Sequence, residues 1–216
     1  MTRYALYFAP PPGDFTDTAA RWLGRALPPI SPDLWPLTSN ARRYGFHATL
    51  KAPFRLKPGL GAPDLIAAMD GFAATCAPVD LAGLELADLD GFLALIPQGD
   101  TGPLNAFAAR VVQDFDPLRA PLTPADYARR NPDQLSPHHR ALLDQWGYPY
   151  VMDSFQFHMT LTDRLRPADA EWLTPLARSS FAPFTNRRLR IDALSLFVED
   201  ADGLFHPHHR TALSGV

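Results

Sequence analysis

The sequence repeats one pattern in two distant stretches, YGFHATLKAPFRL at residues 44–56 and FQFHMTLTDRL at residues 155–165. Both contain Phe-His-x-Thr-Leu. The chain holds only seven histidines in 216 residues, so two copies of one histidine-bearing pentapeptide are improbable by chance. A single His-x-Thr in a strand is usually a half-buried surface pair. Two copies raise the question of whether both strands contribute to one site.

Side chains alternate between the two faces of a strand, so each motif predicts one polar and one apolar face. His47 and Thr49 share a face in the first copy, and His158 and Thr160 share a face in the second. The intervening residues of both copies are apolar and suit contact with helices. If the two strands lie beside each other, the polar faces place two imidazoles and two hydroxyls on the floor of one cleft.

The segments around each motif follow the same order. Apolar and aromatic runs bounded by Pro, Gly and Asp predict strands, and apolar residues at helical spacing predict helices. The expected strands lie at residues 3–10, 45–54, 80–90, 91–98, 155–165, 189–200 and 204–214, and the expected helices at 14–27, 63–76, 103–115 and 167–179, the last interrupted or ended near Pro175. His47 lies 41 residues before Asp88 of a DLDG string, and His158 lies 42 residues before Asp200 of a DADG string. These spacings indicate an internal duplication.

The order of the elements predicts an α+β fold with two similar lobes, in which antiparallel sheets surround a central cleft. We expect a single bilobal domain over residues 1–216. Lobe 1 would cover about residues 1–90 with the C-terminal return strand, and lobe 2 about residues 91–203. Residues 119–149 have no counterpart in the first half and are interpreted as an insertion with a short helix at 137–146. Their Arg-rich and Pro-rich composition is compatible with a lid or rim of the cleft, and equally with a plain surface excursion.

Composition narrows the class of protein. The net charge of −3 and the pI near 6.1 disfavour a protein that grips long nucleic acid through many phosphates. A small phosphorylated ligand, or at most an RNA end, is the expected partner, with no membrane and no obligatory protein partner. Cys76 is the only cysteine, which excludes a disulfide framework and a cysteine-based zinc site. The short apolar run before the N-terminal prolines does not resemble a signal peptide, so we expect a cytoplasmic protein.

Two imidazoles facing one cleft suit general acid–base catalysis, because a histidine changes protonation near neutral pH. One neutral ring takes a proton from water or a hydroxyl group, while the other, protonated, gives one to the leaving oxygen. The two threonine hydroxyls donate hydrogen bonds to phosphate oxygens that carry charge in the transition state. A phosphodiester fits this arrangement, and the chemistry itself needs no cofactor.

Paired His-x-Thr strands in a duplicated α+β chain resemble the two-histidine (2H) phosphoesterase superfamily, which includes RNA 2′,5′ ligase-like proteins and cyclic phosphodiesterases. The full strings at 44–56 and 155–165 are similar to a bacterial branch described as phosphonate-metabolism proteins. The resemblance implies metal-independent cleavage of a small cyclic phosphate, such as a 2′,3′-cyclic nucleotide or a ribose cyclic phosphate. It implies that His47 and His158 are acid and base, and that Thr49 and Thr160 bind the phosphate. It leaves open which histidine is the base. It also leaves open whether the protein hydrolyses the ester or catalyses the reverse ligation.

Further residues are candidates for substrate binding. Lys51 extends the polar row of His47 and Thr49 and is one of two lysines in the chain, so a phosphate contact is favoured over a plain surface role. Thr162 extends the row of the second motif. Tyr44 could stack on a base or a sugar, or belong to the core, and Tyr7 is a weaker candidate of the same kind.

Other functions compete with the phosphoesterase interpretation. The HPHHR string at residues 206–210 invites a metal site, but no carboxylate stands at an obvious ligand spacing, so no metal site is expected. The strongest alternative is a non-catalytic module that binds nucleotides or RNA ends through the same His and Thr side chains. A metal-dependent hydrolase that uses the C-terminal histidines comes third.

Overall fold

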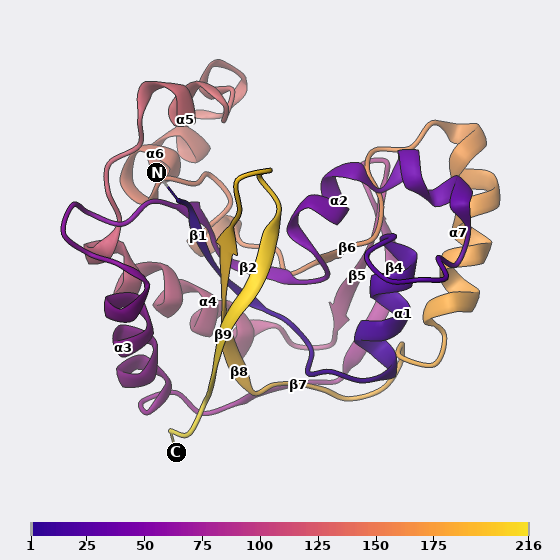
Figure 1. Ribbon diagram of the computed structural model, residues 1–216, viewed down its shortest axis with the longest axis horizontal. Coiled ribbons are helices and arrows are strands. Elements are labelled where there is room, and N and C mark those ends of the chain that lie inside the picture. The colour runs from indigo at the N-terminus through magenta and orange to yellow at the C-terminus, as the bar shows by residue number, and fades with distance from the viewer. Residues whose placement is uncertain (1, 216) are drawn as a thin grey trace.

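The computed structural model describes residues 2–215. A seven-stranded antiparallel sheet crosses the whole molecule (Figure 1). In spatial order its strands are β4 (Gly83–Leu89), β5 (Phe92–Gln98), β6 (Met159–Thr160), β2 (Ala48–Phe54), β1 (Tyr4–Phe8), β8 (Ala193–Glu199) and β9 (Phe205–Ala212). A second, two-stranded sheet pairs β3 (Val79–Leu81) with β7 (Leu189–Ile191). The expected α+β class with antiparallel pairing is therefore confirmed.

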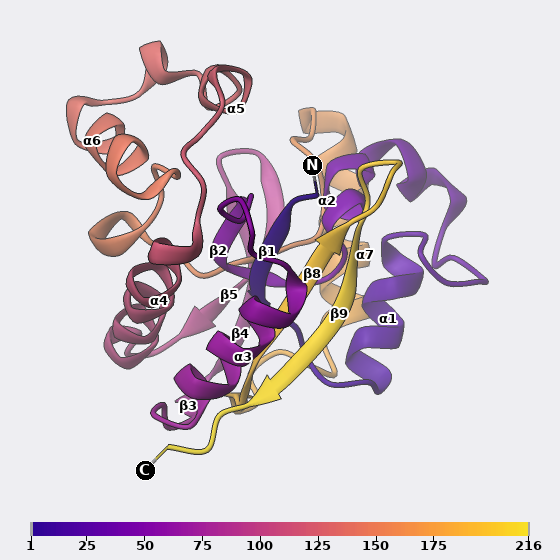
Figure 2. The ribbon, with the colours of Figure 1, turned by 60° about the vertical axis from the view of Figure 1, so that its left-hand side comes forward.

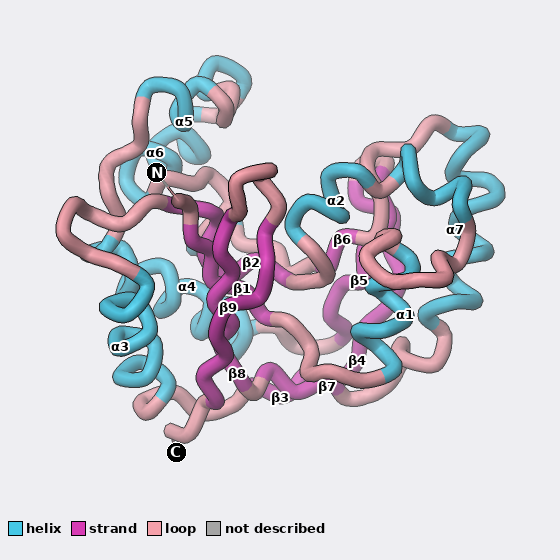
Figure 3. Tube along the Cα trace, viewed as in Figure 1, coloured by secondary structure: helices cyan, strands magenta, loops and turns pink. Residues whose placement is uncertain are grey.

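Helices cover the two halves of the sheet. They are α1 (Asp14–Trp22), α2 (Ser39–Tyr44), α3 (Ala62–Ala73), α4 (Gly102–Phe115), α5 (Pro124–Ala128), α6 (Pro137–Trp146) and α7 (Pro167–Phe181). Short 3-10 turns lie at Pro32–Leu37, Asp116–Leu118, Pro132–Gln134 and Met152–Ser154. Figure 3 shows α3 and α4 beside the half that contains β1, β8 and β9, and α1 and α7 beside the half that contains β4, β5 and β6. No helix within residues 2–215 combines the length and the apolar character needed to cross a membrane.

The sheet has an approximate twofold order. Strands β2 and β6 pair at its middle, and β1 and β5 flank them as equivalents. Beyond these, β4 of the first repeat pairs with β5, and β8 of the second repeat pairs with β1. Each repeat therefore contributes one strand to the half of the sheet that contains the other repeat's His-x-Thr strand. The division into lobes at residue 90 does not describe this sheet, because β4, which ends at Leu89, belongs with β5 and β6.

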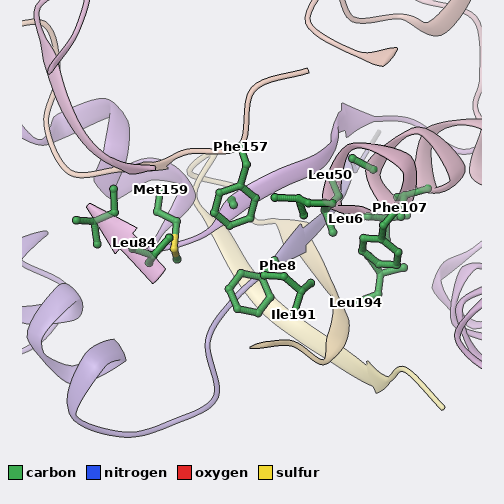
Figure 4. Close-up of a cluster of buried hydrophobic side chains, with 14 of the residues drawn as sticks. Leu6, Phe8, Leu50, Leu84, Phe107, Phe157, Met159, Ile191 and Leu194 are labelled. Atoms are coloured by element: carbon green, nitrogen blue, oxygen red, sulfur yellow. The ribbon is translucent and has the colours of Figure 1, made fainter. Parts of the chain in front are cut away.

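The buried core follows the apolar pattern of the sequence. The predicted stripe of α4 is buried along its whole length, comprising Leu104, Phe107, Ala108, Val111 and Val112. A row of fully buried side chains crosses four strands through the paired residues Phe8, Ala48, Met159 and Leu95. Figure 4 shows Phe8, Phe157 and Met159 in this cluster between the two halves. One continuous core therefore joins the two halves and fixes the relative position of β2 and β6.

The insertion of residues 119–149 folds against α4 (Figure 2). Its helix α6 coincides with the helix expected at 137–146, whereas α5 was not expected. Leu142 packs with Val112 of α4 and with Val151 in a separate apolar cluster. On the other side, Asp126 of α5 pairs with Arg55, next to the end of β2. These contacts hold the insertion over the end of β2 as a packed element.

Two other expectations differ from the structure. The strand expected at 155–165 is reduced to the two residues of β6, because the following backbone amides donate to loops: Asp163 to the Leu37 carbonyl and Leu165 to the Gly91 carbonyl. Helix α7 continues through Pro175 to Phe181, whereas an interruption was expected. Pro175 lies on the exposed side of the helix.

Lys51 of β2 is buried beneath α4. Its side chain is 4% exposed, and its Nζ donates to the Val112 carbonyl at 3.1 Å and to Asp116 at 3.3 Å. Burial lowers the pKa of Lys51 to about 8, although the carboxylate of Asp116 opposes the shift. The folded protein therefore releases this proton at lower pH than the unfolded chain.

We expect Lys51→Met to change how stability depends on pH. Between about pH 8 and 10.5 the unfolded chain still binds the proton that folded Lys51 has released, so the free energy of unfolding of the wild type should rise relative to the variant. The rise should amount to about 3 kcal/mol at most, at roughly 1.4 kcal/mol per pKa unit. Urea unfolding of both proteins at several pH values from 7 to 10.5 measures it. A difference that stays constant with pH would contradict this account of Lys51.

Candidate active site

The two His-x-Thr motifs lie side by side because β2 and β6 pair antiparallel, with Ala48 opposite Met159. In this register His47 stands opposite Thr160 and Thr49 opposite His158. Directly opposed residues have Cβ atoms about 5 Å apart, and diagonal neighbours such as His47 and His158 lie about 7–8 Å apart. Since Ala48 and Met159 face the core, the His and Thr side chains share the other face of the sheet.

A pocket of about 240 Å³ lies over this face. Its lining includes His47, Thr49 and Thr160 of the motifs, together with Tyr7 and Tyr44. His158 does not line this pocket; it is half-buried at the neighbouring position of the sheet, with its ring 5.8 Å from that of Phe92. Three of the four motif residues therefore surround one cavity, and the fourth lies next to it.

Both imidazoles are held in the same way. Nδ1 of His47 lies 2.9 Å from the Gly45 carbonyl, and Nδ1 of His158 lies 2.9 Å from the Gln156 carbonyl. Because a carbonyl only accepts, each Nδ1 carries the proton, and Nε2 of each ring is the atom left for proton transfer. Nε2 of His47 lies 3.2 Å from Oγ1 of Thr49, whose hydroxyl donates to it in the neutral ring.

The conformation before β2 makes the first of these contacts possible. Gly45 ends α2 with φ +75°, ψ −176°, a conformation that side-chain-bearing residues rarely adopt. A Cβ there would meet Nη1 of Arg25 at 3.0 Å. Arg25 in turn donates to the carbonyls of Arg42 and Arg43 and so fixes the end of α2. The Gly45 carbonyl is thereby aimed at His47.

The surroundings of His47 favour its neutral form. The ring of Tyr7 stacks on the imidazole at a centroid distance of 3.8 Å. The imidazole is half-buried among protein atoms. This burial lowers the pKa of His47 to about 4. The hydrogen bond to the Gly45 carbonyl opposes the shift, whereas the positive charges of His158 and Arg25 add to it. His47 is therefore neutral at physiological pH.

The two tyrosines proposed for substrate binding differ in their contacts. Tyr7 lines the pocket but is almost fully buried, and its main contact is the His47 ring. Burial raises the pKa of Tyr7 well above its ordinary value, so it stays neutral. Tyr44 keeps part of its surface exposed at the end of α2, and its ring lies 6.2 Å from the imidazole of His47.

Two proposed substrate contacts are corrected, because the structure places Lys51 and Thr162 away from the pocket. The pairs Tyr7↔Thr49 and Leu6↔Lys51 enclose an extra residue in β2, and this bulge turns Lys51 to the face covered by α4. Oγ1 of Thr162 accepts from the backbone N–H of Leu93 at 2.9 Å and is buried. Both side chains stabilise the fold and do not reach a ligand in the pocket.

Among the polar and aromatic lining residues, the sequence analysis missed three, namely Asn40, Arg130 and Tyr148. Asn40 belongs to α2, a short helix without apolar periodicity. Arg130 and Tyr148 belong to the insertion, whose Arg-rich composition was the only signal. The insertion is thus a rim of the pocket, one of the two roles left open for it.

The C-terminal histidines do not form a cluster of metal ligands. Within residues 2–215, no group of three or more His, Cys, Asp or Glu side chains has the arrangement needed to hold a metal ion. His206 instead contacts Asp200 at 2.7 Å across the turn before β9, and His209 lies 3.9 Å from Asp70 of α3.

Comparisons with known proteins add relatives of this chain. It is 39% identical over 222 residues to ribose 1,5-bisphosphate phosphokinase PhnN of Janthinobacterium sp. (strain Marseille), with 94% of this chain and 49% of that protein covered. It is 34% identical over 213 residues to the protein of the same name from Laribacter hongkongensis (strain HLHK9), with 93% and 49% covered. The chain spans about half the length of the curated relatives it matches.

Solved structures with a similar fold include TT0787 of Thermus thermophilus and E. coli LigT complexed with 3′-AMP. Their identities to this chain are 16% and 15%, each with a TM-score of 0.47 and with 99% of this chain and 98% of the other covered. A third is described as a phosphoesterase, at 15% identity, a TM-score of 0.47 and 99% coverage of both chains.

A family model described as "Protein of unknown function (DUF1045)" matches residues 49–206. The match runs from Thr49 of the first motif, through the second motif and the insertion, to His206 in β9. It covers most of the chain, and the protein therefore belongs to the DUF1045 family.

Proposed function

We propose that this protein is a phosphoesterase that opens a small cyclic phosphodiester by acid–base catalysis with two histidines. The observation that carries the proposal is the pairing of β2 with β6, which brings both His-x-Thr motifs onto one face of the sheet. The diagonal spacing of about 7–8 Å leaves room for a phosphorus centre with one imidazole on each side. In both rings a carbonyl binds Nδ1, which leaves Nε2 for proton transfer and supports the same mechanism.

His47 acts as the base and His158 as the acid. Neutral His47 takes a proton from a water molecule through Nε2, and the water oxygen forms a new bond to phosphorus. The ring ester bond to the leaving oxygen breaks, and Nε2 of protonated His158 gives its proton to that oxygen. The product is a phosphomonoester with a free hydroxyl, and the two histidines exchange protons with solvent to restore the starting state. The lowered pKa of His47 supports this assignment.

Thr49 and Thr160 hold the non-bridging phosphate oxygens. They stand diagonally across the β2–β6 pair, each next to the histidine of the other motif, so a phosphate between the imidazoles lies within reach of both hydroxyls. The Thr49 hydroxyl, which donates to His47 in this structure, turns to a phosphate oxygen when substrate binds. This rotation frees Nε2 of His47 for the attacking water.

The substrate we favour is a cyclic phosphate of ribose formed in phosphonate metabolism. The curated relatives are named for a kinase of ribose 1,5-bisphosphate, and a phosphodiesterase acting on a ribose cyclic phosphate would yield a ribose phosphomonoester of that class. A pocket of about 240 Å³ fits a sugar phosphate better than a polynucleotide. No resident metal or organic cofactor enters the proposed reaction.

The proposal predicts cleavage that resists a chelator and needs both histidines. We expect turnover of at least one member of a panel of 2′,3′-cyclic nucleotides and ribose cyclic phosphates, unchanged by EDTA. His47→Ala and His158→Ala should each lower kcat by about 100- to 10,000-fold, the usual contribution of a general acid or base. Product analysis by phosphorus NMR measures the turnover of the wild type and of both variants. Loss of activity with EDTA would instead favour a metal hydrolase, and tight binding without products would favour a binding module.

The assignment of roles predicts the shape of the pH profile. The acidic limb of kcat/KM should fall near pH 4, where His47 of the free enzyme becomes protonated and ceases to be a base. His158→Ala, which removes the proposed acid, should leave this acidic limb in place. Values of kcat/KM for the wild type and for His158→Ala, measured between pH 3.5 and 9.5, test this prediction. A wild-type profile that does not fall toward pH 4 would contradict the mechanism, and disappearance of the acidic limb in His158→Ala would reverse the roles.

Thr49→Val and Thr160→Val should each lower kcat by about 10- to 100-fold with little loss of stability, since each removes one donor to a charged oxygen. Thr162→Val is the matched control. It leaves the backbone N–H of Leu93 without its acceptor, so it should lower the free energy of unfolding by about 1–3 kcal/mol and leave kcat unchanged. Steady-state kinetics and urea unfolding of the three variants separate the two effects. Wild-type rates in both Thr49→Val and Thr160→Val would remove the hydroxyls from the mechanism.

A further inference from the structure

A second pocket of about 90 Å³ adjoins the candidate active site on the side of the insertion. The two pockets share the lining residues Tyr44, Pro53 and Arg130, so a single ligand can extend from one into the other. The second pocket lies between the N-terminal strand, the end of β2 and the insertion. None of the four His and Thr residues of the motifs is among the residues that line this pocket.

The second pocket is strongly cationic. Five arginines line it, namely Arg3, Arg43, Arg55, Arg129 and Arg130. The carboxylates paired with them are Asp126, which contacts Arg55 and Arg129, and Glu199, which contacts Arg3 and Arg43. Five positive charges therefore face two negative ones, in a protein whose net charge is −3. A local excess of three positive charges at a pocket favours an anionic ligand.

Arg130 is the cation of this group that is free to bind a ligand. Within residues 2–215, no carboxylate lies within salt-bridge distance of its guanidinium, in contrast to the other four. The guanidinium lies over the ring of Tyr148 at 4.8 Å from the centroid, a contact that orients it without occupying its N–H groups. Arg130 follows helix α5, and Asn131 beside it has a left-handed conformation with φ +48°, which turns the chain after Arg130. The insertion thus presents one unpaired guanidinium at the boundary of the two pockets.

We propose that the second pocket binds a phosphomonoester group of the substrate and that Arg130 is the main residue that recognises it. The inference rests on the proposed function and narrows its substrate class to a small cyclic phosphodiester with a second phosphate on another oxygen. The cyclic ester lies between His47 and His158, and the second phosphate lies beside Arg130. The insertion is then a determinant of substrate specificity.

A phosphate group explains these features better than other anions do. A phosphomonoester carries close to two negative charges at neutral pH, which matches the local excess of positive charge. The planar guanidinium donates two parallel hydrogen bonds to phosphate oxygens. The ring of Tyr148 next to Arg130 offers an apolar surface for the sugar that joins the two phosphates.

The test compares matched substrates that differ only in the second phosphate. Ribose 1,2-cyclic phosphate and adenosine 2′,3′-cyclic phosphate serve as two scaffolds, each with its primary hydroxyl free or phosphorylated. Arg130→Gln should lower kcat/KM for the phosphorylated member by about 10- to 100-fold, the loss expected for a charge-assisted hydrogen bond. Because Arg130 also lines the pocket over His47, the effect of the second phosphate is measured by the ratio of kcat/KM for the phosphorylated to the unphosphorylated member, and this ratio should fall in Arg130→Gln. An equal loss with both members would overturn the inference.

Arg140→Gln is the matched control. Arg140 lies in α6 of the same insertion, pairs with Asp133 and lines neither pocket. We expect it to leave the kinetics of both substrates unchanged. A loss of phosphate discrimination in Arg140→Gln as large as in Arg130→Gln would indicate general disturbance of the insertion and would count against Arg130.

Equilibrium binding keeps this inference separate from the proposed reaction. Adenosine 3′,5′-bisphosphate should bind the wild type about 10- to 100-fold more tightly than adenosine 3′-monophosphate does, and Arg130→Gln should abolish the difference. Isothermal titration calorimetry measures both constants, even if no cyclic ester is cleaved. Discrimination without turnover would retain the anion pocket and reject the phosphoesterase. Turnover with equal binding of both nucleotides would retain the phosphoesterase and reject the pocket.

Discussion

The candidate site depends on one register, the antiparallel pairing of Ala48 with Met159 at the centre of the sheet. Strand β6 is only two residues long, so its own ladder cannot fix this register. The fully buried row through Phe8, Ala48, Met159 and Leu95 does so by packing, because a slip of one residue would turn apolar side chains out of the core. The two imidazoles lie on one face of the sheet as a consequence of what is buried on the opposite face.

The approximate symmetry of the sheet does not extend to the environment of the two histidines. Both rings donate Nδ1–H to the carbonyl two residues earlier, which is the symmetric part. Only His47 has a tyrosine stacked on it, and only His47 lines the pocket bounded by the insertion. The surroundings of His47 lower its pKa to about 4, so its neutral form is favoured.

Sequence patterns predicted the parts of this structure that depend on local periodicity. The apolar stripe of α4, the helix at 137–146 and the common face of each His-x-Thr pair follow from spacings of 3.6 or 2 residues. The role of Lys51 was wrong because a bulge in β2 shifts the alternation by one residue after Thr49, and a bulge leaves no clear mark in a single sequence. Arg130 and Tyr148 were missed for another reason. They lie in irregular chain, where position depends on tertiary contacts such as Arg55 with Asp126.

The insertion makes the two sides of the candidate site different from each other. A twofold site built from two equal motifs would accept a phosphodiester in either orientation with similar affinity. Residues 119–149, which have no counterpart in the first half, supply part of the lining of the cationic pocket, so the two sides of the candidate site differ. In the proposed reaction Arg130 would distinguish the two ends of the substrate, and the end it selects would determine which ester oxygen faces His158. Orientation, and with it the choice of leaving group, then follows from an electrostatic contact outside the repeated motifs.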